Sequence, residues 1–69
     1  MNEKKELAAL LTPREAAAIL RVSKETLNVW RCTRRYPLPF VKIGRSVRYR
    51  QADIERFIRD RTIDAGADI

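Results

Sequence analysis

The chain has 69 residues, of which 45% are hydrophobic and 35% are charged, a composition typical of a folded domain rather than a disordered segment. A chain this short buries only about 60% of its unfolded surface, which excludes a second domain and a large enclosed active site. The absence of histidine excludes histidine-based catalysis, and a single cysteine makes neither an internal disulfide nor a zinc site.

Other functional classes are excluded by what the sequence lacks. It contains no apolar run near the ~18 residues of a membrane span and no signal-peptide core at its N-terminus. It also contains no nucleophile–base pair, and its two glycines cannot build a phosphate-binding loop. We therefore expect a cytoplasmic protein that is not an enzyme, with no cofactor, no metal and no small-molecule substrate.

The net charge is +6, and the positive charge is concentrated in the middle of the chain. No acidic residue occurs between Thr26 and Ala52, whereas this window holds seven basic residues. They are Arg31, Arg34, Arg35, Lys42, Arg45, Arg48 and Arg50. A basic zone inside a patterned domain indicates a surface that binds a polyanion, most commonly nucleic acid. The alternative is a merely solvated basic surface.

The two ends of the chain are weakly patterned. Residues 1–10 and 62–69 lack a helical or strand periodicity, and we expect both to be flexible. The folded domain is therefore expected to span residues 11–61.

The first firm element is a helix that begins after Thr12. Thr12 at the N-cap, Pro13 at the first helical position and Glu15 at the third fit a capping box. Alanines give the segment a high helix propensity and a slim surface that another helix can approach closely. Its expected buried face consists of Ala16, Ile19 and Leu20.

A second helix is predicted from Lys24 to about Thr33. Ser23 is its expected N-cap, and Glu25 in the first turn favours the helix dipole. The residues expected to point inward are Val22, Leu27 and Trp30, and those on the opposite face are Lys24, Thr26, Asn28 and Arg31. Two short helices joined by a three-residue turn predict a helix-turn-helix, with an unrelated helical hairpin as the alternative.

A β-hairpin is predicted next, because Pro37 and Pro39 exclude a helix. Residues 40–43 are rich in β-formers, residues 44–46 are expected to form a turn, and residues 47–50 alternate, with Val47 and Tyr49 on one face. A last helix is expected from about Gln51 to Arg61. Its predicted core stripe consists of Ile54, Phe57 and Ile58.

This order of elements predicts a mainly α fold with a small hairpin wing, a winged helix-turn-helix. A major groove admits one α-helix, and a basic hairpin tip can reach the adjacent backbone or minor groove. The expected partner is therefore double-stranded DNA.

The sequence resembles the AlpA-like and excisionase-like proteins, which are related to the MerR-type winged helix. The resemblance lies in TPREAA at 12–17, VSKETL at 22–27, Trp30, LPFVKIGR at 38–45, VRYR at 47–50, and the pairs at 53–54 and 57–58. It covers residues 11–59. One departure is Arg34, where many members have a glycine that ends the recognition helix. Arginine adopts the left-handed conformation of a C-terminal cap less readily than glycine does, so the sequence leaves the end residue of this helix undetermined.

The resemblance implies a small DNA-architectural factor of a phage, prophage or integrative element, associated with the bacterial nucleoid. Such factors bind repeated sites near an attachment site, bend the DNA and bias a tyrosine recombinase toward excision. Some members are instead transcriptional regulators. A third interpretation is a module that docks a recombinase or replication protein and binds DNA weakly. Because one small module covers little DNA, we expect cooperative self-association on repeated sites.

We assign candidate DNA contacts to three groups of residues. In the recognition helix they are Ser23, Lys24, Thr26, Asn28 and Arg31; in the wing, Lys42, Arg45, Ser46 and Arg48; and on the DNA backbone, Arg34, Arg35 and Arg50. Thr26 has the alternative of satisfying the backbone at the helix start, and Asn28 has the alternative of being a solvated surface residue. Arg48 has the alternative of packing against Lys42 or Arg50, although like charges facing each other would repel.

The remaining cysteine and aromatic residues are assigned to packing or self-association. Cys32 is expected to be a small, half-buried side chain rather than a reactive thiol. Trp30, Tyr49 and Phe57 are expected in the core, because a chain this short needs its large side chains to fold. Tyr36 and Phe40 are expected to be exposed and available for self-association.

Overall fold

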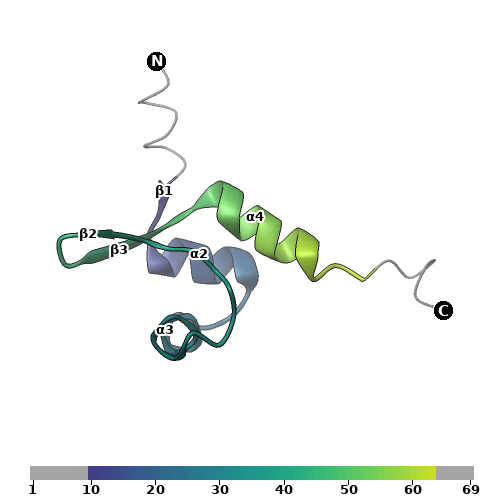
Figure 1. Ribbon diagram of the computed structural model, residues 1–69, viewed down its shortest axis with the longest axis horizontal. Helices are drawn as coiled ribbons and strands as arrows, with labels where there is room; N and C mark the ends of the chain where they lie inside the picture. The colour runs from purple at the N-terminus through teal and green to yellow at the C-terminus, as the bar shows by residue number, and fades with distance from the viewer. Residues whose placement is uncertain (1–9, 64–69) are drawn as a thin grey trace, which may run out of the picture.

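The computed structural model describes residues 10–63, which form three helices and a three-stranded antiparallel sheet (Figure 1). In chain order the elements are β1 (Leu10–Leu11), α2 (Pro13–Leu20), α3 (Lys24–Thr33), β2 (Val41–Ile43), β3 (Ser46–Arg50) and α4 (Gln51–Asp60). The hairpin β2–β3 and helix α4 project to opposite sides of the body that α2 and α3 form (Figure 1). This is a winged helix-turn-helix, as predicted. The termini expected to be flexible fall almost entirely outside the described residues.

The capping box at the start of α2 is confirmed. The Thr12 hydroxyl accepts a hydrogen bond from the Glu15 amide at 3.1 Å, and the Thr12 amide donates to Glu15 Oε1 at 2.9 Å. The predicted buried face is partly wrong, because Ala16 and Ala17 are buried while Ile19 is 45% exposed. Residues two apart on a helix point about 200° apart, so a helix that packs on Ala17 turns Ile19 toward solvent.

The turn between α2 and α3 begins at Arg21, which adopts a left-handed conformation with φ of 59°. Its amide donates to the Ala17 and Ala18 carbonyls and so ends α2. Ser23 then caps α3 by accepting from the Thr26 amide at 3.0 Å, as predicted. At the far end, Arg34 adopts the left-handed cap with φ of 56°, although it is not a glycine.

The sheet contains a strand that the sequence analysis missed. The strand order is β1-β3-β2, and β1 pairs with β3 through Leu10 opposite Arg50 and Leu11 opposite Tyr49. Leu10, assigned above to the flexible N-terminal segment, is therefore part of the sheet. A strand of two residues has too short a pattern to detect, and its partner lies far along the chain.

The hairpin turn is shorter than predicted. Ser46 was expected in the turn but begins β3 and pairs with Ile43, which leaves Gly44 and Arg45 as the two turn residues. Gly44 has φ of +60°, and a glycine at the first of two loop positions fits a type II′ turn, whose twist matches that of paired strands.

Helix α4 closes the core with Ile54 and Phe57, which are 0% and 8% exposed. Ile58, the third residue of the predicted stripe, is 41% exposed, so this part of the prediction is wrong. The reason is that α4 contacts α2 and β3 while its C-terminal turns extend beyond them (Figure 1). The core cluster consists of Ala16, Ala17, Leu27, Tyr49 and Ile54. Within residues 10–63, no helix combines the length and apolarity needed to cross a bilayer.

Candidate nucleic-acid interface

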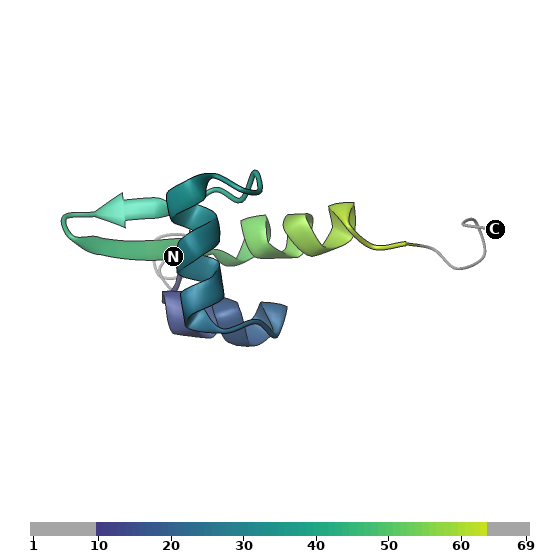
Figure 2. The ribbon, with the colours of Figure 1, turned by 90° about the horizontal axis from the view of Figure 1, so that it is seen from below.

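Helix α3 is held against the body by its inward face. Leu27 is 1% exposed, and Val22 and Trp30 pack against the core cluster, as predicted. Figure 2 shows α3 lying across the molecule, with the hairpin on one side of it and α4 on the other. Within residues 10–63, this placement leaves the outer side of α3 exposed, as at Val29, which is 56% exposed.

The four residues predicted to share one face of α3 do not do so. Lys24 and Asn28 lie one turn apart on the same side, whereas Thr26 is two residues from each and points roughly the opposite way. Thr26 Oγ1 also accepts a hydrogen bond from Ser23 Oγ at 2.8 Å. The structure therefore places Thr26 in the helix cap, which was the alternative interpretation of this residue.

Arg31 is half-buried rather than fully presented to solvent. Its Cζ lies 5.7 Å from the centre of the Phe40 ring, and its Nε is buried and has no hydrogen-bond partner among residues 10–63. Nearby, burial raises the pKa of the Tyr49 phenol, and the positive charge of Arg31 offsets part of that effect. Only part of the Arg31 side chain is therefore available to a ligand.

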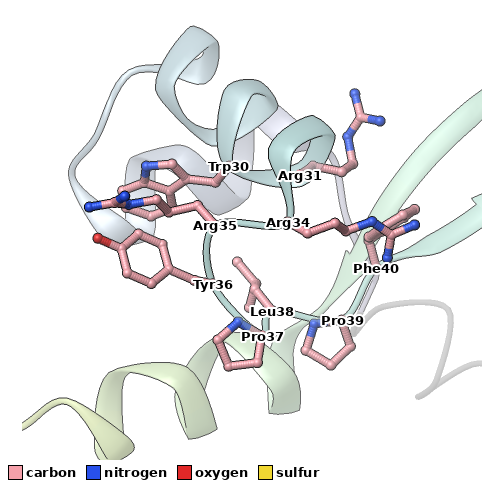
Figure 3. Close-up of a pocket in the computed structure, with 9 residues that line it drawn as sticks. All are labelled: Trp30, Arg31, Arg34, Arg35, Tyr36, Pro37, Leu38, Pro39 and Phe40. Atoms are coloured by element: carbon pink, nitrogen blue, oxygen red, sulfur yellow. The ribbon is translucent and has the colours of Figure 1, made fainter.

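Arg34 and Arg35 lie at the rim of an open hollow of about 600 Å³ at the C-terminal end of α3 (Figure 3). Arg34 Cζ lies 5.5 Å from the Phe40 ring centre at one end, and Arg35 Cζ lies 5.5 Å from the Tyr36 ring centre at the other. None of the described residues that line the hollow is acidic. The predicted backbone-contacting arginines are thus backed by aromatic rings, a feature that the sequence analysis missed although Tyr36–Phe40 alternates large side chains with proline.

Tyr36 and Phe40 are not the free exposed rings that were predicted. Both are half-buried, and Tyr36 stacks edge-on against Trp30 with ring centres 4.9 Å apart. Tyr36 also contacts the Phe57 ring at 6.0 Å, which ties the loop after α3 to α4. Cys32 was predicted to be half-buried, but its thiol is exposed, so this prediction is wrong.

The register of the hairpin separates the predicted wing residues. Arg48 is opposite Val41, and Lys42 is opposite Val47, so Lys42 and Arg48 lie on different faces. The predicted repulsion between cross-strand cations is therefore absent. Arg48 is half-buried and its Nη1 donates to the Val47 carbonyl at 2.8 Å.

The turn and the base of the hairpin differ in charge. Arg45 and Ser46 are exposed at the turn, inside the stretch from Thr26 to Ala52 that contains no acidic residue. Arg50 lies at the base, and its Nε is 3.8 Å from Asp53 Oδ2, with 65% of the arginine side chain exposed. An exposed pair at this distance contributes little stability. It does reduce the positive potential at the base relative to the turn.

The structure thus brings two basic elements to the surface, the outer side of α3 with its C-terminal hollow and the hairpin turn. Lys24, Arg34, Arg35, Lys42 and Arg45 are all exposed. A helix with an adjacent basic hairpin fits the width of a major groove and its neighbouring backbone.

Of three comparisons with known proteins, one found a match, and it agrees with this arrangement. A search of curated proteins and a search of solved structures each found no match. A family model described as a helix-turn-helix domain matches residues 10–62, which is most of the chain and includes β1. The protein therefore belongs to this helix-turn-helix domain family and is a DNA-binding helix-turn-helix protein.

Proposed function

We propose that this protein is an excisionase-like recombination directionality factor. In this proposal it binds repeated sites in double-stranded DNA, bends the DNA and biases a tyrosine recombinase toward excision. The proposal extends the family assignment with the resemblance of the sequence to excisionase-like proteins. The observation that carries it is the pairing of a recognition helix with a basic hairpin, together with the absence of acidic residues from Thr26 to Ala52, a stretch that covers the hairpin and all of the helix but its first two residues.

The proposed docking places α3 in the major groove. Ser23, Lys24 and Asn28 then face base edges or nearby phosphates, Thr26 supports the cap, and Arg31 contacts the backbone. Arg34 and Arg35 bind phosphates at the end of the helix, where their guanidinium groups are exposed. In the wing, Arg45 and Ser46 reach the backbone or minor groove, with Lys42, Arg48 and Arg50 adding charge along the hairpin.

Several copies are expected to act together, because a single module of this size buries only about 600–1,000 Å² on DNA. A lone copy would have little specificity, whereas adjacent copies on repeated sites add their contacts. This need for repeated sites is what favours an architectural role, since closely spaced copies impose a cumulative bend on the DNA.

The genomic location of the sites tests the proposal. Fragmented DNA from the source genome is captured on the purified protein and sequenced. Clusters of repeated sites beside a recombinase attachment site are the expected result. Sites confined to promoters would instead identify a transcriptional regulator, and no enrichment over bulk DNA would contradict specific DNA recognition.

A second experiment separates DNA binding from docking of a recombinase or replication protein. The double variant Arg45→Ala/Arg48→Ala is compared with Arg56→Ala/Arg59→Ala, which removes the same charge from α4. If the wing contacts DNA, the first variant loses affinity and its log–log salt slope falls by about 2, since each phosphate contact contributes about 1. Equal loss in both variants would show that only net charge matters. Excision activity unchanged by the wing variant would favour the docking module.

A further inference from the structure

Two buried polar atoms lie where the recognition helix meets the wing. In the described part of the chain, Arg31 Nε and Tyr49 Oη are the buried side-chain polar atoms that have no hydrogen-bond partner. A buried polar group without a partner costs more than an ordinary hydrogen bond contributes. Arg31 Nε can only donate a hydrogen bond, whereas the Tyr49 hydroxyl can accept one.

The two side chains face each other across a small internal space. Both line a cavity of about 10 Å³, together with Leu27 and Trp30 of α3. Arg31 is close enough to Tyr49 for its charge to act on the phenol. A slight rotation of the guanidinium, or one water molecule in a space of this size, would join Nε to the hydroxyl.

Tyr49 is well suited to hold another residue in place. Its ring is 1% exposed and belongs to the core cluster, and its backbone pairs with Leu11 of β1 in the central strand of the sheet. Phe40 lies on the Arg31 guanidinium, with 5.7 Å between Cζ and the ring centre. Arg31 therefore lies beside Phe40 and Tyr49 of the wing region although it belongs to α3, and in Figure 3 its side chain extends from α3 away from Tyr36.

We propose that Tyr49 is a positioning residue for Arg31, and that this pair fixes the recognition helix and the wing in one orientation for DNA binding. The buried Nε of Arg31 is held by the Tyr49 hydroxyl, while the half-exposed side chain presents its terminal nitrogens to a phosphate between the two elements. This proposal rests on the proposed function, because it assigns the pair a role in reading DNA.

A double-mutant cycle in DNA affinity tests the coupling. Tyr49→Phe keeps the ring and removes only the hydroxyl, and it is expected to weaken binding of the wild-type site by about threefold to tenfold, the range of one hydrogen bond. In the Arg31→Ala background, Tyr49→Phe is expected to change affinity no further. Tyr36→Phe is the matched control: Tyr36 lines the same cavity, but in Figure 3 its hydroxyl lies on the side away from Arg31, so no loss is expected. Equal losses from Tyr49→Phe in both backgrounds would overturn the coupling.

An NMR measurement on the free protein tests the pair without DNA. The Nε proton of Arg31 is expected to exchange with solvent much more slowly than that of exposed Arg45, and to exchange faster in Tyr49→Phe. Thermal unfolding of each variant confirms that it is folded. Exchange of Arg31 as fast as Arg45 would overturn the positioning role. Because this readout is independent of DNA, slow exchange in a protein that binds no DNA would reject the proposed function while retaining the contact.

Discussion

Two arginines adopt backbone conformations that favour glycine. Arg21 and Arg34 have φ of 59° and 56°, and each ends one helix of the helix-turn-helix. A non-glycine residue in this region costs roughly 1–2 kcal/mol. In both cases the amide of the arginine is used to satisfy carbonyls of the preceding turn. The chain tolerates this strain at Arg34 at a position where a guanidinium reaches the surface beside Phe40.

Replacing Arg34 by glycine should therefore stabilise the fold and weaken DNA binding. The relief of strain, less the entropy that glycine loses on folding, should raise the free energy of unfolding by about 0.5–1 kcal/mol. This corresponds to a rise in Tm of about 2–8 °C, measurable by thermal unfolding. Arg35→Gly is the control, because Arg35 has no positive φ and should give no gain. A lower Tm for Arg34→Gly would show that its side-chain contacts outweigh the strain.

The buried phenol of Tyr49 predicts a loss of stability at alkaline pH. Burial raises its pKa above the ordinary value, and Arg31 offsets only part of this effect. In the unfolded chain a tyrosine ionises near pH 10, whereas the native protein keeps the Tyr49 proton to higher pH. The native state therefore holds more protons in this window, and stability falls as pH rises above about 10.

Denaturant unfolding between about pH 9 and pH 11 measures this dependence. Tyr49→Phe should flatten the decline, whereas Tyr36→Phe leaves Tyr49 in place and should retain it. An identical decline in the wild type and Tyr49→Phe would assign the alkaline loss to other groups.

At the scale of the elements, local sequence signals decided where the helices begin. Each of the first two helices starts at a hydroxyl residue whose side chain accepts from the amide three residues on, Thr12 in one and Ser23 in the other. These contacts involve only neighbours in sequence, so they could be predicted from the residues alone.

Removing the cap of α2 should reduce stability with little effect on DNA binding. Thr12→Ala should lower the free energy of unfolding by about 1 kcal/mol, because the Glu15 amide loses its partner. Thr33→Ala is a matched control, since the Thr33 hydroxyl donates to the Val29 carbonyl within α3 and caps no amide. Chemical denaturation compares the two. An equal effect of both substitutions would show that the cap itself contributes nothing specific.

Elements whose position depends on distant partners were predicted less well. β1 exists because Leu10 and Leu11 pair with Arg50 and Tyr49, about forty residues away. Ile19 and Ile58 carry the right residue type at plausible helical positions, yet they are 45% and 41% exposed, because the neighbouring elements do not cover those sides. The spacing of hydrophobic residues predicts a helix. It does not predict how wide a face of that helix the neighbouring elements will cover.

For the whole molecule, the charge distribution predicts strongly salt-dependent and cooperative DNA binding. With about six phosphate contacts, affinity should fall by about 10³-fold or more between 50 and 200 mM salt. Titration of DNA carrying one, two or three sites measures both effects. Affinity per site should rise with the number of adjacent sites. A flat salt response would contradict electrostatic binding, and equal affinity for isolated and repeated sites would contradict cooperation.

The sequence by itself determined the order of the elements, the cap of each of the first two helices, the prolines that end helical structure and the acid-free basic window. These features depend only on residue type and on contacts between residues that are near neighbours in the sequence. Only the tertiary structure decided that β1 pairs with β3, that Ile19 and Ile58 stay exposed, and that the Nε of Arg31 is buried beside Tyr49. Strand pairing and helix packing set these outcomes, and both depend on contacts between segments that lie far apart in the chain.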